Sequence, residues 1–354
     1  MKITLILPSV DAGGLERVIT ELAHYFAGKG GLHVVIVSLS KGRIFYPLPE
    51  GISTYMPSFS SKRLLRLLFL ARLFFWLRGR IRSVEPDILL CFGGKFNSFV
   101  LLSVYGLPVR VFVSDRSRPS IRYGRFLDWF NPIMYRKAAG IIAQTERAKR
   151  CMYIRTGHSN IRVIGNPLRM FEDEKGDREK IILNVGRFIH SKKQELLVRF
   201  VAQIQPRDWK LCLIGNGPHL NEVKRVATEL GIKDKMVFPG VVGNLEAYYR
   251  KSSIFAFTSV SEGFPNALGE AMSAGLACIS FDCEAGPSEL IQDGINGFLV
   301  PENDHDRYLQ KLTLLVEDES LREKLGVKAR ASIEKYSTEK IGQMFLDFFN
   351  QHHG

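Results

Sequence analysis

The feature that most constrains this chain is a repeated alternation of short apolar runs with longer helical patterns. The apolar runs of the first half fall at 3–8, 33–39, 87–92, 109–114 and 140–145. Amphipathic segments separate them, beginning with one predicted to be a helix from about Leu15 to Gly28. Strands and helices that alternate in this way form a mostly parallel sheet with helices on both faces.

The alternation restarts after a polar segment at 165–180. This segment contains the Asn166-Pro167 pair, which breaks regular structure and indicates a linker. The later apolar runs fall at 181–186, 209–215, 236–240, 253–259, 277–282 and 297–301, and 305–354 has a helical pattern. A chain of 354 residues is long enough for two domains with separate cores. We therefore predict two doubly wound α/β domains.

The net charge of +13 is distributed unevenly along the chain. Residues 1–165 contain 25 Lys and Arg against 9 Asp and Glu, a net charge of +16. Residues 166–354 contain 24 against 27, a net charge of −3. The first half alone is therefore expected to meet a polyanion, which could be nucleic acid, anionic lipid or a phosphorylated substrate.

The cysteines and the N-terminus indicate the compartment. The five cysteines contain no CxxC pair, which argues against a disulfide framework or a zinc site and favours a reducing compartment. The first apolar run is about five residues long and leads into a glycine turn, so it is predicted to be a strand and not a signal peptide. No window supplies the roughly 20 apolar residues of a spanning helix. We expect a cytoplasmic protein.

Two glycine-rich loops follow predicted strands. In DAGGLERV (11–18), Gly13 and Gly14 would let the backbone approach a ligand at a helix N-terminus, although a tight turn explains them equally well. The motif is not GxGxxG, so a dinucleotide fold is poorly supported. In LIGNGPHL, Gly215 and Gly217 could bring amides near a nucleotide, and this signal is weak.

A basic loop, NVGRFIHSKKQ (184–194), follows the first predicted strand of the second half. Arg187 lies just past the strand, with Lys192 and Lys193 about one turn further on. A planar guanidinium and a compact ammonium on one loop suit a diphosphate. The alternative is a solvated basic loop.

The stretch SEGFPNALGE (261–270) places Glu262 and Glu270 eight residues apart across a turn. A helix is predicted to begin near Ala267, which leaves Glu262 on the loop and Glu270 in the first turns. The amides of Asn266, Ala267 and Leu268 would then face an anion. This arrangement suits a nucleoside diphosphate better than a hydrolase with two catalytic carboxylates.

The segment at 62–82 carries seven Lys and Arg around a very apolar centre. One interpretation is a core helix with basic ends. The other is a helix at an anionic bilayer surface, or one that meets an acceptor diphosphate, through Lys62, Arg63, Arg66, Arg72 and Arg78. The interleaved Leu and Phe favour lipid over nucleic acid.

The motif EGFPNALGE resembles the E-x7-E signature of retaining GT-B glycosyltransferases of family 4, also called glycosyl transferases group 1. GGLER, VGRFIHSKK and SELIQDGINGFLVP resemble the same family in the same order along the chain. The likeness implies a GT-B fold, in which two Rossmann-like domains face a central cleft. We expect an N-terminal acceptor domain at 1–167, a nucleotide-sugar domain at 168–338, and a C-terminal helix at 339–354 that returns to the first domain.

The resemblance also implies roles for individual residues. Glu270 resembles the acid that binds the ribose hydroxyls, and Glu262 the acid near the hydroxyls of the transferred sugar. Arg187 and Lys192 resemble the pair that holds the diphosphate and stabilises the leaving group, so that no metal or other cofactor is required. Further backbone contacts to the donor are implied for Phe264, Pro265, Asn266, Ala267, Leu268 and Gly14.

Two departures from the family pattern affect these roles. Many relatives have glycine after the lysine matched by Lys192, where this chain has Lys193. Many also place a histidine near the donor sugar, where this chain has the loop SDRSRPS. Asp115 and Arg116 of that loop, together with Glu16, are therefore candidates for the sugar or acceptor side.

The resemblance implies a monomeric enzyme of bacterial surface-polysaccharide or lipid-linked glycan synthesis. It would move a sugar from a nucleotide-sugar, with UDP favoured, to a lipid-linked glycan on the cytoplasmic face of the inner membrane. A nucleotide-sugar 2-epimerase of the same fold is one alternative, although no clear histidine is available as its acid/base. A non-catalytic membrane-associated binding protein is another alternative.

Overall fold

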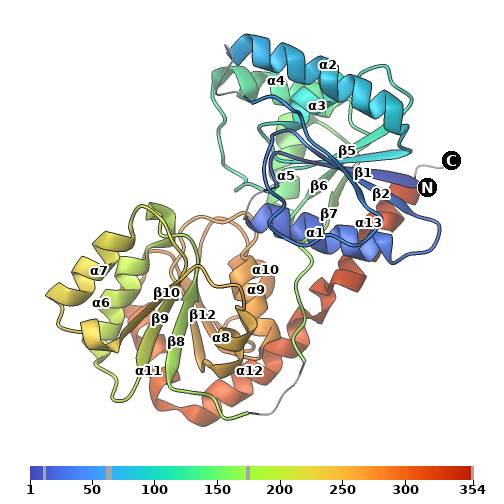
Figure 1. Ribbon diagram of the computed structural model, residues 1–354. Coiled ribbons are helices and arrows are strands. Elements are labelled where there is room, and N and C mark those ends of the chain that lie inside the picture. Colours follow the sequence, from blue (N-terminus) through green and yellow to red (C-terminus); the bar gives the residue numbers. More distant parts are fainter. Residues whose placement is uncertain (11–12, 61–65, 173–175, 352–354) are drawn as a thin grey trace. The chain divides into compact units, whose positions relative to one another are not determined.

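The chain divides into two compact units in the computed structural model (Figure 1). Unit 1 comprises Met1–Pro167 and Thr338–Gly354, and unit 2 comprises Leu168–Ser337. The structure describes residues 1–10, 13–60, 66–172 and 176–351. Each unit has its own parallel sheet and its own buried core, as the restart of the sequence pattern predicts.

Unit 1 is built on a seven-stranded parallel sheet with the order β3-β2-β1-β4-β5-β6-β7. In that order the strands are Ser53–Tyr55, His33–Ser38, Lys2–Leu7, Ile88–Phe92, Arg110–Ser114, Gly140–Ala143 and Ile161–Val163. The central strands are buried on both faces, which explains their continuous apolar sequences.

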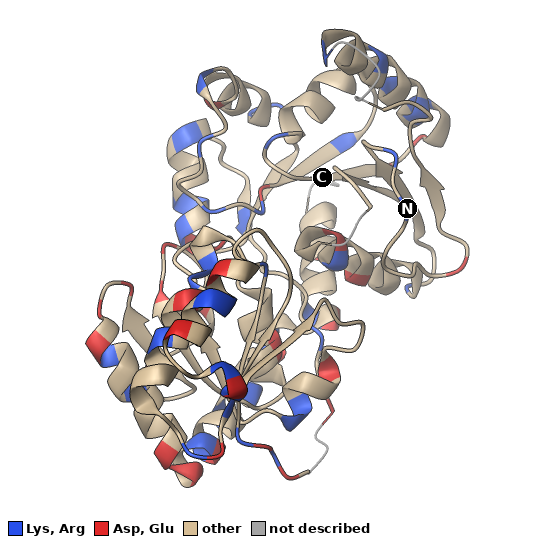
Figure 2. Cartoon of the chain, turned by 60° about the vertical axis from the view of Figure 1, so that its left-hand side comes forward, with Lys and Arg blue, Asp and Glu red and all other residues tan. Residues whose placement is uncertain are grey.

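Helices cover both faces of this sheet (Figure 1). They are α1 (Gly14–Ala27), α2 (Arg66–Val84), α3 (Asn97–Ser103), α4 (Arg125–Tyr135), α5 (Glu146–Thr156) and α13 (Thr338–Asn350). The apolar residues of α2 to α5 share one core cluster with the strands. Many of the basic residues of unit 1 lie on α2 and α5 (Figure 2).

The C-terminal helix α13 packs on unit 1, beside α1, as the family resemblance implies. The rings of Phe348 and Phe349 pack against Phe112 of β5, with centroids 5.2 and 4.8 Å away. Gly342 faces the ring of Tyr25 so closely that a Cβ would lie well inside 3.0 Å of it. The glycine therefore sets how near the two helices approach.

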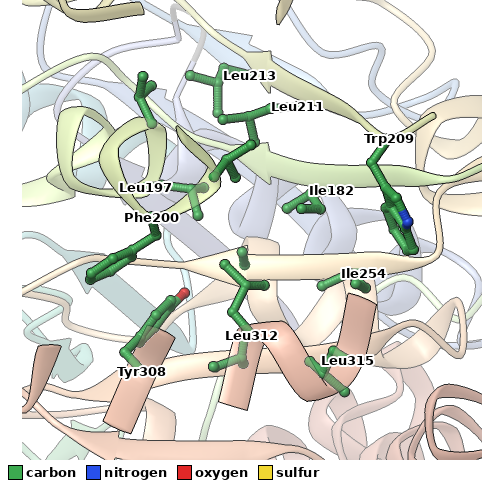
Figure 3. Close-up of a cluster of buried hydrophobic side chains, with 14 of the residues drawn as sticks. Ile182, Leu197, Phe200, Trp209, Leu211, Leu213, Ile254, Tyr308, Leu312 and Leu315 are labelled. Atoms are coloured by element: carbon green, nitrogen blue, oxygen red, sulfur yellow. The ribbon is translucent and has the colours of Figure 1, made fainter. Parts of the chain in front are cut away.

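Unit 2 is built on a six-stranded parallel sheet with the order β10-β9-β8-β11-β12-β13. In that order the strands are Met236–Gly240, Lys210–Ile214, Ile181–Val185, Ile254–Phe257, Ala277–Asp282 and Phe298–Pro301. Its helices are α6 (Gln194–Ile204), α7 (Leu220–Glu229), α8 (Glu246–Lys251), α9 (Asn266–Ser273), α10 (Pro287–Leu290), α11 (His305–Glu317) and α12 (Glu319–Ile333). Figure 3 shows part of the core, where Phe200, Tyr308 and Leu312 from the helices meet Ile182 and Ile254 of the strands.

Both sheets reverse their strand order beside the first strand of the unit. In unit 2 this switch point lies between β8 and β11, which pair directly through Ile254 and Phe255. In open α/β sheets, ligands bind outside the carboxyl ends of the strands at such a point. The loops that follow β8 and β11 are therefore where a ligand of unit 2 is expected.

Four of the five cysteines are buried, and Cys151 on α5 is only half-buried. Burial raises the pKa of the Cys212 thiol to about 11 and that of Cys283 to about 12. Burial also raises the pKa of Cys91 and Cys278 well above the ordinary value. Because the thiolate is the reactive form, iodoacetamide at pH 8 should modify Cys151 at least about tenfold faster than the others. Peptide mass spectrometry over time tests this, and equally fast labelling of Cys91 would contradict it.

Candidate functional site

The site of unit 2 is formed by two loops at its switch point. The first loop runs from Gly186 through the short 3-10 turn η2 (His190–Lys192) into α6. The second runs from the end of β11 into α9. Because β8 and β11 are neighbours in the sheet, residues about 70 positions apart in the sequence meet here.

The first loop is fixed by hydrogen bonds on both sides. The amide of Phe188 donates to the carbonyl of Asn216 (3.0 Å), and the side-chain amide of Gln194 donates to the carbonyl of Arg187 (3.0 Å). On the other side, the amide of Val260 donates to the carbonyl of Ser191 (2.9 Å). The backbone at Arg187 is therefore held in place by hydrogen bonds to Asn216 and Gln194.

Gly215 and Gly217 allow the backbone of this loop to pack closely against the segment that follows β9. Both have positive φ values, +138° and +157°, and a Cβ on either would lie well inside 3.0 Å of the loop backbone at Gly186 or Phe188. The sequence suggested that these glycines bring amides to a nucleotide. In the structure, their bare Cα atoms face the loop that carries Arg187.

The guanidinium of Arg187 is exposed at the site. Within the described part of the chain it makes no hydrogen bond or ion pair, whereas most of its backbone neighbours are engaged. A planar cation held ready on an ordered loop is well suited to a bidentate contact with a phosphate.

Lys192 and Lys193 point to different neighbours. The ammonium of Lys192 pairs with the Glu262 carboxylate, and the two side chains are only 19% and 10% exposed. Lys193 instead approaches Glu195 (3.9 Å) and His190 (3.4 Å). The structure therefore brings Lys192, and not Lys193, to the second loop.

Lys193 adopts the left-handed conformation, with φ +50° and ψ +37°. This conformation strains a residue with a side chain by about 1 kcal/mol, and glycine adopts it without that cost. The glycine that many relatives have at this position therefore suits the backbone, independent of any contact with a ligand. The hydroxyl of Thr258 secures the turn by donating to the carbonyls of Lys192 (2.9 Å) and Lys193 (3.1 Å).

Helix α9 begins at Asn266, one residue before the predicted start, and separates the two acids. Glu262 lies on the loop that precedes it. Glu270 lies on the helix and is only 5% exposed, and one of its carboxylate oxygens accepts a hydrogen bond from the Tyr249 hydroxyl (3.1 Å). The two carboxylates are thus held by different partners, an ammonium and a phenol, and do not form a pair with each other.

The segment between the acids is anchored by its side chains. Phe264 is buried against Tyr336, with ring centroids 5.3 Å apart, and Leu268 is fully buried. Pro265 lies against Gly286, where φ is +110° and a Cβ would lie well inside 3.0 Å of the proline ring. Since α9 begins at Asn266, the backbone amides of Ala267 and Leu268 lie in its first turn. Amides in the first turn of a helix have no acceptor within the helix.

Three supporting residues were not singled out from the sequence. Thr258 holds the η2 turn, Tyr249 holds Glu270, and Gly286 makes room for Pro265. Thr258 directly follows the apolar run of β11, so its place at a strand end was a usable signal. Nothing local marks Tyr249 or Gly286, because each acts through a contact distant in sequence.

In the described part of the glycine loop of unit 1, from Gly13 onward, Glu16 contacts the loop itself. Glu16 folds back over Gly13, where a Cβ would lie well inside 3.0 Å of its carboxylate, and accepts a hydrogen bond from the Ser9 hydroxyl (2.9 Å). Gly13 has an extended backbone, and the atom nearest to its Cβ position is the carboxylate end of the flexible Glu16 side chain. Gly14 is the first residue of α1.

Asp115 and Arg116 follow β5 but face different surroundings. Burial raises the pKa of the Asp115 carboxyl, which accepts hydrogen bonds from the Tyr123 hydroxyl (3.0 Å) and the Ser117 amide (3.1 Å). The guanidinium of Arg116 donates to Asn166, and burial lowers its pKa to about 9. Arg116 therefore lies in the interior of unit 1, over the ring of Phe92, whereas Asp115 lines a cavity.

The basic residues proposed for a membrane or diphosphate divide into three groups. Lys62 and Arg63 lie outside the described residues. Arg72 stacks over the ring of Phe59 at 4.4 Å, and Arg78 donates to the carbonyls of Ser103 and Tyr105 at 2.9 Å each. Arg66 is exposed at the start of α2.

Helix α2 is both a core helix and an exposed one. Leu73, Leu77 and Ile81 are buried against the sheet, as the core interpretation predicts. Its outer face exposes Leu67 (81%) and Phe75 (70%), while contact of this face with a bilayer stays a prediction. Among the described residues, no helix combines the length and apolar character that would let it cross a membrane.

The fold and the site together define a class of protein. The chain has two Rossmann-like units, each with a parallel sheet. At the switch point of the second unit, a loop with basic side chains lies beside a helix that is flanked by glutamates. This is the arrangement of a GT-B glycosyltransferase. Residues 12–169 match the model described as "Glycosyltransferase Family 4", and residues 167–332 match "Glycosyl transferases group 1". The chain belongs to this glycosyltransferase family.

Individual proteins agree with this assignment. The chain is 26% identical to a Campylobacter jejuni N-acetylgalactosamine-N,N'-diacetylbacillosaminyl-diphospho-undecaprenol 4-alpha-N-acetylgalactosaminyltransferase, over 98% of this chain and 99% of the relative. It is 29% identical to the lipopolysaccharide 1,6-galactosyltransferase of Escherichia coli, over 96% and 95%. The crystal structure of Anabaena Alr3699/HepE in complex with UDP matches with a TM-score of 0.77 at 17% identity, over 99% and 100% of the two chains.

Proposed function

We propose that this glycosyltransferase moves a sugar from a UDP-sugar to a hydroxyl of a lipid-linked glycan, with retention of the anomeric configuration. The observation that carries the proposal is the ion pair of Lys192 with Glu262 at the switch point of unit 2, on a loop that also carries the exposed Arg187. Two cations and a carboxylate on two ordered loops suit a sugar diphosphate, because the phosphates need positive charge and the sugar hydroxyls need an acceptor.

In the proposed mechanism the acceptor hydroxyl attacks the anomeric carbon on the face that the diphosphate leaves. The bond between this carbon and the diphosphate oxygen breaks, and the acceptor proton passes to the leaving diphosphate. Arg187, Lys192 and the first amides of α9 stabilise the negative charge that develops there, without a metal ion. Glu262 binds hydroxyls of the transferred sugar, and Glu270, oriented by Tyr249, binds the ribose.

The identity of the substrates is inferred from relatives. HepE binds UDP in its crystal structure, which supports UDP as the nucleotide. The name of the Campylobacter relative includes a diphospho-undecaprenol acceptor, and the E. coli relative acts on lipopolysaccharide. These names support a lipid-linked acceptor in surface-polysaccharide synthesis for this chain, and the predominantly buried, free thiols suit the cytoplasmic side of the inner membrane.

Donor binding tests the proposal directly. Thermal unfolding is measured with UDP, GDP and a panel of UDP- and GDP-sugars, followed by donor hydrolysis for each. We expect UDP and one UDP-sugar to raise the unfolding temperature, because a ligand that binds only the folded state stabilises it. The absence of any shift and any hydrolysis with all nucleotides would contradict the proposed function.

We also propose that the outer face of α2, together with α4, rests on an anionic bilayer; both helices pack against α3. Phe126 and Trp129 on α4 are 66% and 64% exposed, and Phe75 on α2 is 70% exposed. The described part of α2 carries five arginines and no acidic residue. Exposed aromatic and aliphatic side chains beside arginines suit the headgroup region of anionic lipids.

Vesicle sedimentation tests this surface. The protein is expected to bind vesicles containing phosphatidylglycerol at low salt and to be released at high salt, because the attraction is screened. Replacing Leu67 and Phe75 with glutamine should weaken binding severalfold without changing the charge. Val327→Gln, on the equally exposed Val327 of unit 2, serves as the control. No binding to these vesicles at low salt would refute the proposed surface.

A further inference from the structure

Unit 1 contains a cavity that is lined by residues of unit 1. Its volume is about 360 Å³, within the range of small-molecule sites. It lies beside Asp115, just past the carboxyl end of β5, and is closed by α4 and α5. Its lining includes Asp115, Arg122, Tyr123, Asp128 and Arg155.

The buried part of the cavity is acidic and ordered. Asp115 is 6% exposed, and its carboxylate accepts from the Tyr123 hydroxyl, whose oxygen is also in hydrogen-bond contact with the Ser117 hydroxyl at 2.9 Å. Gly94 lies directly behind this pair, and a Cβ there would lie well inside 3.0 Å of both Asp115 and Tyr123. The absence of a side chain at Gly94 therefore allows the carboxylate and the phenol to meet.

The exposed part of the cavity is basic. Arg122 and Arg155 are both exposed, and within the described residues neither guanidinium makes a hydrogen bond or an ion pair. The acidic residue near them, Asp128, instead accepts a hydrogen bond from the Tyr123 amide at 2.8 Å. The two guanidiniums at the rim are thus available to bind an anion. The Asp115 carboxylate inside the cavity would repel an anion.

This polarity indicates what the cavity would accept. A ligand must place neutral hydroxyls near Asp115 and Tyr123, and negative charge near Arg122 and Arg155. A sugar that carries a phosphate has both parts, and guanidiniums contact phosphate oxygens with strong charge-assisted hydrogen bonds. The arginines of α2 are less suited, because Arg72 and Arg78 already contact Phe59, Ser103 and Tyr105.

We propose that this cavity binds the sugar phosphate of the glycan acceptor, with Arg122 and Arg155 on the phosphate and Asp115 on a sugar hydroxyl. This inference rests on the proposed function, since it supplies that reaction with its acceptor. The acceptor phosphate is thereby assigned to the cavity between α4 and α5, and not to the arginines of α2. The bilayer surface then remains as the proposed ligand of the exposed face of α2.

Binding of glucose 1-phosphate to the whole chain tests the site. The titration uses an Arg187→Ala background, so that the donor loop contributes little to phosphate binding. Arg122→Gln and Arg155→Gln should each raise the dissociation constant about ten- to a hundredfold, the range expected for one charge-assisted contact. Arg147→Gln, on the same helix as Arg155 but outside the cavity, should leave it unchanged. Methyl glucoside should bind at least tenfold more weakly than glucose 1-phosphate.

Several results would overturn the inference. These are the absence of glucose 1-phosphate binding, equal binding of methyl glucoside, and unchanged affinity in both arginine variants. If the two variants instead weaken binding to phosphatidylglycerol vesicles and not to glucose 1-phosphate, the arginines serve lipid headgroups and the acceptor assignment fails. The outcome is independent of the donor site, since loss of transfer in Arg187→Ala can be observed whichever way this titration turns out.

Discussion

Replacing Arg187 with alanine is expected to lower kcat/KM for sugar transfer by about 10²- to 10³-fold, the usual effect of removing one preorganised donor to a developing negative charge. The fold should be unaffected. The guanidinium is exposed and makes no hydrogen bond or ion pair with the described residues, so its removal leaves no buried group without a partner. A large kinetic effect without a change in stability is the signature of a group that contacts the substrate.

The controls for this prediction come from the same unit. Arg199→Ala removes an exposed arginine from α6 and should leave transfer unchanged. Arg187→Lys keeps the charge without the planar fork, so an intermediate rate is expected. Lys193→Gly should retain activity and unfold at slightly higher denaturant, because the left-handed backbone at this position favours glycine. Wild-type transfer rates in Arg187→Ala would refute the assignment of the diphosphate to this loop.

Gly215→Ala is expected to destabilise unit 2 by about 3 kcal/mol or more, among the largest effects of any single substitution in the chain. Its φ of +138° is rarely adopted by residues with a side chain. The new Cβ would also meet the backbone carbonyl of Gly186, which cannot rotate away as a flexible side chain would. Relief of this clash must displace the loop that carries Arg187, so activity should fall even in the fraction that folds.

Hydrogen exchange followed by mass spectrometry measures this effect within unit 2. Protection of peptides from β8 and β9 should drop sharply in Gly215→Ala, while peptides from unit 1 keep theirs. Gly243→Ala is the matched control, because no atom lies within 4 Å of its Cβ position and its φ is not positive. Unchanged protection of β8 in Gly215→Ala would show that the two loops are not as closely packed as described.

Local patterns predicted most of the regular structure. The apolar run at 277–282 coincides with β12, and the run at 181–186 exceeds β8 by one residue. The edge strands β3 and β7 were not predicted. Each has only three residues, too few for an alternating or continuous apolar pattern, and each is stabilised by pairing with a neighbour.

The sequence predicted which residues form the candidate site better than it predicted which of them are in contact. Arg187, Lys192 and Glu262 were all named, but the contact of Lys192 with Glu262 depends on the pairing of β8 with β11, which no local pattern encodes. The glycines show the limit most clearly. Gly13 and Gly215 are predicted to approach a ligand, and the structure adds close contacts with Glu16 and with the Gly186 carbonyl that the sequence did not predict. A sequence shows that a side chain must be absent, but not which neighbour requires it.

The central claim is that the diphosphate leaves from a site built of cations and amides, and that the acceptor attacks on the same face. The most direct test is proton NMR of the transfer product, formed from the active UDP-sugar in the presence of EDTA. We predict product with the anomeric configuration of the donor, formed at an undiminished rate without divalent metal. Product of the opposite configuration, or no product until metal is restored, would contradict the account.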